Sequence, residues 1–183
     1  MNQQTYLKVP FVWEEHRPLI EVPQRLTFKP VNAMHGNQLI SIVVRVWASS
    51  MNPSHQRKVS EPEPHQAVER YLSSASDDFS YQDSWWQFGI NESGDVVGFV
   101  LPVIFKNCAK EDLEEATIYD IGVVPEYRGL GFANDLLLQG TRMLQDIGVW
   151  RIFCDTDVNN VRMISTFKRV GYRQYGERWE RPI

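Results

Sequence analysis

Hydrophobic positions repeat at two different spacings along the chain, and the spacing changes near residue 85. Apolar side chains over residues 39–47 recur every three to four positions, which predicts a helix with one buried face. A second, shorter helix is predicted over residues 65–74 for the same reason. Residues 51–64 combine Pro, Ser and both signs of charge without apolar periodicity, so we expect a mobile loop there.

Beyond residue 85 the pattern becomes that of β-strands. Residues 85–90 and 95–105 are rich in aromatic and β-branched side chains, and the Asn-Glu-Ser-Gly segment between them has turn chemistry. These features predict a β-hairpin. A third strand is predicted over residues 116–124, where Pro125 ends it.

Helices alternate with strands in the last third of the chain. Helices are predicted over residues 132–147 and 160–170, each followed by a glycine that can end it. Strands are predicted over residues 150–155 and 172–179. An antiparallel hairpin followed by crossover helices indicates an α/β fold, in which a mixed, mostly antiparallel sheet has helices on both faces.

Length and composition favour one globular domain. A chain of 183 residues buries a sizeable core but is short for two ordinary domains. Its 43% hydrophobic and 23% charged residues lie near the globular average. We therefore expect a single domain over residues 1–183.

The distribution of charge is more informative than its sum. The net charge of −4 and the pI of about 5.6 disfavour a nonspecific nucleic-acid binder. Residues 71–126 carry 11 acidic and 2 basic side chains, whereas the final third is slightly basic. This asymmetry suits a cationic acceptor that meets a polyanionic donor, although solvated acidic loops would give the same pattern.

The sequence gives no indication of a membrane span, an export signal or a metal site. The longest apolar run, residues 96–105, is half of what a spanning helix needs. Glu14 and Glu15 interrupt the region where an export signal has its apolar core. Cys108, Cys154 and the four histidines lack metal-ligand spacing, and we expect the histidines to be solvated. The expectation is a cytoplasmic protein that binds no metal, membrane or nucleic acid.

The segment over residues 123–134, VVPEYRGLGFAN, is predicted to run from a strand through a glycine-rich turn into a helix. The first N–H groups of a helix are unpaired, and glycines allow an anion to approach them closely, so the segment predicts a phosphate site. A tight connection without a ligand is the alternative. Gly131 is not followed by Lys-Ser/Thr, which excludes a Walker loop. A dinucleotide site with Asp155 on the ribose is a minor alternative.

The same residues resemble the signature of the GCN5-related N-acetyltransferases. The family pattern Arg/Gln-x-x-Gly-x-Gly/Ala appears in this chain as Arg128-Gly129-Leu130-Gly131-Phe132-Ala133. The resemblance continues through Asn160 to Gly171-Tyr172 and covers about residues 85–180. It implies that residues 85–180 form the cofactor-binding core of the single domain. Residues 1–84 would be its variable part, with a strand, helices and the loop over residues 51–64.

The resemblance also implies a position for acetyl-coenzyme A (acetyl-CoA), between the strand that ends near Val123 and the strand that ends near Asp155. The main chain of residues 121–123 would pair with the pantetheine arm, and the turn would surround the pyrophosphate. The positions it assigns to the cofactor are Ile121, Gly122, Val123, Arg128, Gly129, Leu130, Gly131, Phe132, Ala133, Asn134 and Asn160. Asn160 is equally interpreted as the N-cap of its helix, and the two roles are compatible.

Transfer to an amine requires a base, because an amine with a pKa of about 10.4 is protonated at neutral pH. Asp155 lies five residues before Asn160, where the branch of the family that acetylates ribosomal-protein N-termini carries an acidic base. Asp120 is the second candidate, and strand alternation places it on the face opposite Tyr119 and Ile121. For both carboxylates the alternative role is a surface group or a loop cap.

Phe167 departs from the family pattern, which usually has a Tyr seven residues after the Asn to protonate the departing sulfur. Phenylalanine cannot donate a proton, although a thiolate is a tolerable leaving group and Tyr172, Ser165 or water could substitute. On the acceptor side we expect an aromatic wall, with residues 51–64 as a lid. The wall residues would be Tyr71, Tyr81, Trp85 and Trp86.

The residues and the resemblance together favour an acetyl-CoA-dependent N-acetyltransferase that acts by direct attack of a primary amine. The alternative is an acyl-CoA binding or sensing module with little turnover, which the phenylalanine at position 167 favours. The sequence does not name the acceptor, and a homodimer is left open because a fold resemblance does not fix the assembly.

Overall fold

The computed structural model describes residues 5–14, 25–33 and 37–182. Within these ranges one sheet has the strand order β2-β4-β5-β6-β7-β1-β8, with β3 paired to β5 and β9 paired to β1. The strands are β1 (Thr5–Glu14), β2 (Thr27–Pro30), β3 (Phe79–Ser80), β4 (Gln87–Ile90), β5 (Val96–Phe105), β6 (Glu114–Val123), β7 (Val149–Asp157), β8 (Arg173–Gln174) and β9 (Trp179–Pro182). The pairing of β6 with β7 is parallel and the other ladders of the described chain are antiparallel.

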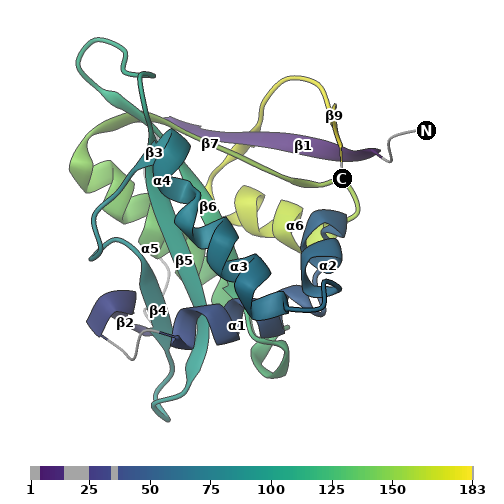
Figure 1. The fold of residues 1–183 in the computed structure, drawn as a ribbon. Coiled ribbons are helices and arrows are strands. Elements are labelled where there is room, and N and C mark those ends of the chain that lie inside the picture. The colour runs from purple at the N-terminus through teal and green to yellow at the C-terminus, as the bar shows by residue number, and fades with distance from the viewer. Residues whose placement is uncertain (1–4, 15–24, 34–36, 183) are drawn as a thin grey trace.

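Helices cover both faces of this sheet, as Figure 1 shows. The helices are α1 (Gln38–Trp47), α2 (Pro53–Val59), α3 (Pro64–Ser73), α4 (Ala75–Asp78), α5 (Phe132–Ile147) and α6 (Val161–Val170), with short 3-10 turns over Val31–Ala33 and Pro125–Tyr127. One core cluster joins α1 and α3 to β4 and β5, and a second joins α5 and α6 to β1 and β7. The predicted fold class, a mixed and mostly antiparallel sheet between helices, is confirmed.

Helices α5 and α6 begin and end within one residue of where the sequence predicts. Helix α5 lies between Gly131 and Gly148, which have φ angles of 84° and 89° that side chains with a Cβ rarely adopt. Helix α6 begins after Asn160, whose side chain accepts a hydrogen bond from the amide of Met163, and ends at Gly171. These caps fix where both helices begin and end.

Strands β6 and β7 separate after a short parallel ladder. They pair only where residues 114–116 of β6 face residues 149–152 of β7. Beyond the ladder, the Oγ1 of Thr117 lies 3.8 Å from the Sγ of Cys154. On its other edge β6 stays paired with β5 as far as Val123. Over residues 117–123, therefore, the edge of β6 that faces β7 has no strand partner in the described chain.

A β-bulge overturns the expectation that Asp120 and Tyr119 face opposite sides of the sheet. Leu101 pairs with Asp120 but Pro102 pairs with Ile118, which leaves Tyr119 as an extra residue in β6. Proline has no N–H for the ladder and is found at such irregularities. Both Asp120 and Tyr119 consequently point toward α1 and α3, where each has a hydrogen-bond partner.

Two other expectations differ from the structure. The predicted mobile loop over residues 51–64 contains α2, which begins with a proline and is capped by the Asn52 side chain. Its periodicity was not recognisable because none of its seven residues is fully buried. The predicted last strand is divided into β8 and β9, since Gly176 between them has a φ of 67° that breaks the extended chain.

Candidate functional site

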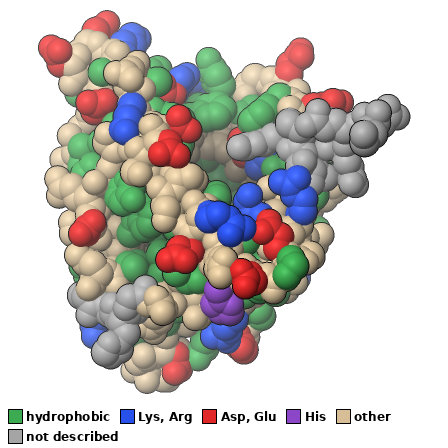
Figure 2. Space-filling model, in the orientation of Figure 1, with side chains coloured by type: hydrophobic (Ala, Val, Ile, Leu, Met, Phe, Trp, Pro, Cys, Tyr) green, Lys and Arg blue, Asp and Glu red, His purple; other side chains and the backbone are tan. Residues whose placement is uncertain are grey.

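Two adjoining pockets lie where β6 and β7 separate. The first, which we call the turn cleft, has a volume of about 530 Å³ and lies between β6, the turn before α5, and α6. The second, the inner pocket, has about 660 Å³ and lies between β6, β7, α2 and α3. Five residues line both pockets and define their junction: Val46, Ser50, Ile121, Asn160 and Met163. In Figure 2 basic and acidic side chains lie side by side around the hollow on this face.

The turn cleft brings together the positions that the family resemblance assigns to a cofactor. All eleven line it except Leu130, whose side chain is 55% exposed. Gly129 and Gly131 have φ angles of 82° and 84°, so the turn requires residues without a Cβ at both positions. The first residues of α5 line the cleft directly after this turn. Their unpaired amides and the positive end of the helix dipole are suited to an anion.

Arg128 has a different role in the structure from the other turn residues. Its guanidinium donates hydrogen bonds to the carbonyl of Val123 at 3.0 Å, the carbonyl of Val46 at 3.0 Å, and Ser49, whose carbonyl is at 2.9 Å and whose Oγ is at 2.8 Å. Burial lowers the pKa of this arginine. The side chain therefore holds the turn against the end of α1, and it also lines the cleft.

Arg25 holds the opposite side of the turn. Its guanidinium donates to the carbonyl of Leu130 at 2.7 Å, lies 2.7 Å from a carboxylate oxygen of Asp135, and covers the ring of Phe132 at 5.0 Å. The turn is therefore fixed by an arginine on each side. Sequence reasoning did not identify Arg25, because its contact with Leu130 joins positions that are 105 residues apart in the chain.

Helix α6 adds two cationic side chains to the turn cleft that sequence reasoning did not identify. Arg162 and Arg169 are seven residues apart, so they lie on one helical face, and both line the cleft. Neither has an ion-pair partner among the described residues. Asn160 lines the cleft as well, while its Oδ1 accepts from the Met163 amide at 3.2 Å, so the helix cap is confirmed.

Asp120 is a buried carboxylate of the inner pocket, next to the junction. It is 7% exposed, and it accepts hydrogen bonds from the Trp47 indole at 3.0 Å and the Ile121 amide at 2.8 Å. Burial raises the pKa of Asp120 to about 7, even though both hydrogen bonds and the ammonium of Lys8 favour its charged form. A carboxyl with this pKa can both accept and release a proton near neutral pH.

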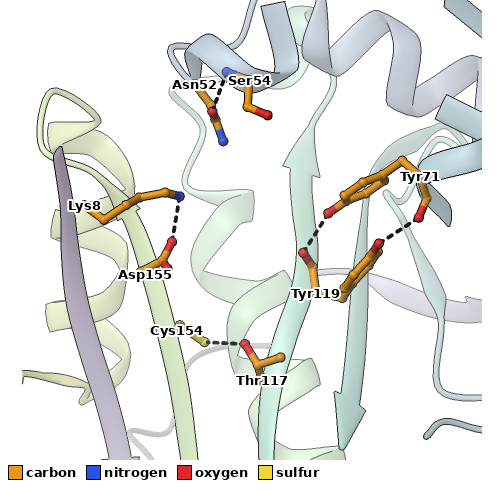
Figure 3. A network of polar contacts seen from close by, with 8 residues as sticks. All are labelled: Lys8, Asn52, Ser54, Tyr71, Thr117, Tyr119, Cys154 and Asp155. Atoms are coloured by element: carbon orange, nitrogen blue, oxygen red, sulfur yellow. Dashed lines mark hydrogen bonds and ion pairs between the residues drawn. The ribbon is translucent and has the colours of Figure 1, made fainter. Parts of the chain in front are cut away.

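Asp155 lines the same pocket from β7, but it is already paired. Its Oδ1 lies 2.6 Å from the Nζ of Lys8 on β1, and both side chains are largely buried. Figure 3 shows this pair on one wall of the pocket and the two tyrosines of α3 and β6 on the other. The two candidate carboxylates therefore share the inner pocket, which Lys8 of β1 also lines.

The aromatic wall of the inner pocket differs in part from the expected one. Tyr71 lines the pocket as expected, whereas Tyr81, Trp85 and Trp86 do not. Those three pack in the core, where Tyr81 stacks on Trp86. Other aromatic residues take their place in the wall: Tyr6, Phe79, Phe105, Tyr119, Phe153, Phe167 and Trp179.

Tyr71 and Tyr119 fix each other across this wall. Their rings stack at 4.7 Å, the Tyr119 hydroxyl donates to the Tyr71 carbonyl at 2.7 Å, and the Tyr71 hydroxyl donates to the Tyr119 carbonyl at 3.1 Å. Burial raises the pKa of Tyr119 above its usual range. The Tyr119 phenol is therefore neutral at physiological pH, and the two rings hold each other as part of the wall.

His55 of α2 contradicts the expectation of solvated histidines. Its ring stacks on Trp47 at 4.2 Å, and its Nδ1 lies 3.2 Å from the Oγ of Ser50. Burial, with smaller effects of Lys8 and Lys58, lowers the pKa of His55 to about 3. Trp47 and His55 belong to different helices, α1 and α2, so periodicity alone could not reveal their contact. His65 is exposed as expected, and His16 and His35 lie outside the described residues.

Phe167 contributes to the core and to the inner pocket. It stacks on Phe11 at 4.9 Å and lines the inner pocket one helical turn after Met163 of the junction. The hydroxyl of Tyr172 is buried 2.8 Å from the Oγ1 of Thr141 and reaches neither pocket, so it does not substitute for a missing hydroxyl at position 167. Ser165 lines only the turn cleft.

Within residues 5–14, 25–33 and 37–182 there is no cluster of three or more potential metal ligands. Cys108 and Cys154 are free thiols, and burial raises the pKa of Cys154 to about 12, so it is not a nucleophile. No helix in the same ranges is both long and apolar enough to cross a membrane.

Comparison with known proteins gives one family and several relatives. The model of the "Acetyltransferase (GNAT) family" matches residues 45–172. A mycothiol acetyltransferase of Pseudarthrobacter chlorophenolicus is 34% identical over 58 residues, which are 32% of this chain and 18% of the relative. A mycothiol acetyltransferase of an Arthrobacter species is 33% identical over 58 residues, with the same coverage. The match thus spans less than a fifth of these relatives' length.

Solved structures show the same fold at low identity. A GCN5-related N-acetyltransferase from Sphaerobacter thermophilus has a TM-score of 0.64 and 15% identity, and the match covers 98% of this chain and 53% of that one. A putative acetyl transferase from Pyrococcus furiosus has a TM-score of 0.62 and 21% identity, and the match covers 86% of this chain and 99% of that one. At these identities the likeness supports the fold.

Proposed function

This chain belongs to the GNAT family of acetyltransferases, and from that membership and its site we propose that it transfers an acetyl group from acetyl-CoA to a primary amine. The observation that carries the proposal is the junction of the two pockets. An anion-binding turn opens into one pocket, and a buried carboxylate with a raised pKa faces the other. A thioester at the junction would meet an amine that has a base beside it.

The turn cleft is suited to the phosphates and the pantetheine arm of acetyl-CoA. The amides after Gly131 would bind the pyrophosphate, and Arg162 and Arg169 supply positive charge next to them. The unpaired edge of β6 over residues 117–123 offers main-chain groups to the amides of the arm, as a further strand would. These contacts would place the acetyl group at the junction.

We assign the first proton transfer to Asp120 rather than to Asp155. An ammonium must lose a proton before its nitrogen can attack, and a base works best when its pKa lies near the working pH. Asp120 meets this condition, with a pKa of about 7, and it lies next to Ile121 at the junction. Asp155 accepts from Lys8 at 2.6 Å, so its role would be to hold that ammonium in the pocket wall.

The charges of the inner pocket favour a cationic acceptor. Four aspartates line it, Asp77, Asp78, Asp120 and Asp155, against the two lysines Lys8 and Lys58 and a neutral His55. The excess of negative charge attracts an ammonium, and the deeper carboxylate then accepts its proton. These charges favour an acceptor amine that carries positive charge.

The proposal is tested by thiol release. Purified protein is incubated with acetyl-CoA and a panel of primary amines of different charge, and free CoA is measured with a thiol reagent, while calorimetry measures binding of the donor. We expect binding, and faster release with cationic amines than with neutral ones. If calorimetry detects no binding at millimolar acetyl-CoA, the proposal is wrong.

A second function, an acyl-CoA binding module with little turnover, has one observation in its favour. Phe167 places a ring without a hydroxyl at the junction side of the inner pocket. The same experiment separates the two functions, since a binding module would give a calorimetric signal and no amine-dependent thiol release across the panel.

A further inference from the structure

Transfer to an amine moves two protons, and Asp120 accounts for one of them. After the neutral amine has attacked the carbonyl, its nitrogen is positively charged and must lose a second proton. The sulfur that departs as a thiolate must gain one, because a thiol with a pKa of about 8.5 is mostly protonated at neutral pH. Phe167 cannot supply that proton.

Ser50 has the position that such a transfer requires. It is one of the five residues that line both pockets, and its hydroxyl is the only alcohol among them. Its Oγ lies 3.2 Å from the Nδ1 of His55 and accepts from the amide of Asn52 at 3.1 Å. When Nδ1 carries the ring proton, the oxygen accepts two N–H groups, and its own hydrogen is free to point into the junction.

His55 connects Ser50 to the acceptor side. Its ring lines the inner pocket, and stacking on Trp47 at 4.2 Å and 13° fixes the plane of the ring. The second nitrogen, Nε2, has no polar partner among the described residues and is available to an acceptor amine. The charged or titratable groups near the ring are Lys8, Lys58 and Asp120, the last of which accepts a hydrogen bond from the indole of Trp47.

We propose that His55 and Ser50 carry the second proton from the acceptor amine to the departing sulfur. The amine N–H bond breaks as Nε2 of His55 gains the proton. The Nδ1 proton of His55 passes to the Oγ of Ser50, and the Ser50 hydroxyl proton passes to the sulfur as the carbon–sulfur bond breaks. The amide and the free thiol form, and His55 returns to its first tautomer when the two nitrogens exchange protons with solvent.

The neutral state of the histidine is consistent with this path. A pKa near 3 disfavours a free imidazolium, and none forms if one ring nitrogen loses its proton as the other gains one. Other hydroxyls are less suitable. Ser165 lines the turn cleft alone, and the phenol of Tyr172 is bonded to Thr141 in the core.

The path rests on the proposed function, and the experiment separates the two. Thiol release is measured for the wild type, Ser50→Ala, Ser50→Thr, and Ser76→Ala as a matched control on the exposed surface of α4. We expect Ser50→Ala to lower kcat by about 100-fold, the lower end of general acid catalysis, with the KM for acetyl-CoA nearly unchanged. Ser50→Thr keeps a hydroxyl and should retain most of the rate.

A rescue variant supplies the decisive comparison. A hydroxyl added by Phe167→Tyr would reach the inner pocket near the junction, so Ser50→Ala/Phe167→Tyr should recover at least about tenfold in kcat. The same tyrosine should not rescue Asp120→Asn, which lacks the first proton acceptor.

Each other outcome has one meaning. A wild type that releases no thiol with any amine overturns the proposed function. An active wild type with Ser50→Ala at full rate overturns the proton path alone. A slow Ser50→Ala whose KM rises in proportion, and which the tyrosine does not rescue, shows that Ser50 positions the donor and likewise overturns the path.

Discussion

Asp120 and Asp155 face one pocket, but their surroundings give them different chemistry. Asp155 has a lysine ammonium at 2.6 Å, whereas the donors to Asp120 are a neutral indole and an amide. Neutral donors offset only part of the cost of burying a carboxylate. The sequence placed both residues in predicted strands, and only the side-chain contacts of the structure distinguish the proposed base from the ion-paired wall residue.

We predict that Asp120→Asn removes the acidic limb of the pH–rate profile. If the ionised carboxylate acts as the proposed base, kcat should rise with pH through about 7 and then level off. The amide variant should be slower by about 100-fold or more at pH 7, and its rate should approach that of the wild type above pH 9, where more amine is neutral. Rates with one amine from pH 5.5 to 9.5 check this.

Asp155→Asn is the matched control for that profile. It should keep the limb near pH 7, because the carboxyl that titrates there is retained. If Asp155→Asn loses the limb and Asp120→Asn keeps it, the assignment of the base is reversed.

Trp47→Phe should move the acidic limb to higher pH. The indole N–H stabilises the ionised form of Asp120, so its loss raises the pKa of that carboxyl. A hydrogen bond to a charged group contributes about 1.5–3 kcal/mol, which corresponds to a shift of about 1 to 2 pH units. The same pH series measures the shift. An unmoved limb in a variant that still binds acetyl-CoA would show that Asp120 is not the titrating group.

At the scale of elements, the turn before α5 depends on side chains from other elements for its shape. Arg128 links it to α1, and Arg25 links it to Asp135 in the first turn of α5. The glycines allow the backbone path and the two arginines hold it. A pre-formed turn binds an anion without a further cost of ordering.

We predict that Arg128→Lys weakens acetyl-CoA binding through the turn. Lysine keeps the charge but cannot reproduce the planar fork that reaches Val46, Ser49 and Val123 together. The affinity should fall by about tenfold and the unfolding free energy by about 1–3 kcal/mol. Calorimetry and chemical denaturation measure the two effects. Lower affinity with unchanged stability would instead assign Arg128 a direct contact to the phosphates.

Sequence periodicity was sufficient for the long elements and insufficient for the irregular ones. Helices α5 and α6 could be predicted because their apolar stripes end at glycines, and the hairpin of β4 and β5 because of its turn residues. The bulge at Tyr119 could not, since it depends on a register with Pro102 on another strand. Helix α2 could not either, because none of its residues is fully buried and its sequence has no apolar stripe.

The candidate site shows the same division. The turn over residues 128–134 could be located from its glycines before a helix, and Asn160 from the family resemblance and its position at a helix start. Lys8, Ser50 and His55 could not, because they line the inner pocket from β1, from the segment after α1 and from α2, and nothing in the sequence shows that these segments meet.

At the scale of the whole molecule, the net charge of −4 conceals an uneven field. The turn cleft has Arg162 and Arg169 on its α6 side, while the inner pocket has more aspartates than lysines. A polyanionic donor and a cationic acceptor would thus be attracted to opposite sides of one junction.

We predict that Arg162→Gln and Arg169→Gln raise the KM for acetyl-CoA and leave kcat nearly unchanged. Each guanidinium would contribute to binding the donor and to nothing in the chemical step, so the loss should be about three- to tenfold per residue. The KM of the wild type for acetyl-CoA should also rise between 50 and 300 mM salt, and the KM of the double variant should rise less.

Arg70→Gln, whose partner is Glu61 on the surface, is the control. Equal salt dependence in the wild type and the double variant would contradict this assignment.

We predict that residues 1–84 and 85–180 unfold together as one domain. The core cluster beside α1 and α3 combines residues of both parts, with Val43, Trp47 and Val68 packed against Phe99 and Leu101. Separation would expose this apolar surface on each part, so neither part is expected to keep its structure alone.

Calorimetry should give one transition whose calorimetric and van't Hoff enthalpies agree, coincident with loss of tryptophan fluorescence and helical signal. Acetyl-CoA at 100 times its dissociation constant should stabilise that transition by about 2.7 kcal/mol. Two transitions, with the ligand shifting only the second, would show that the N-terminal helices form a separate unit.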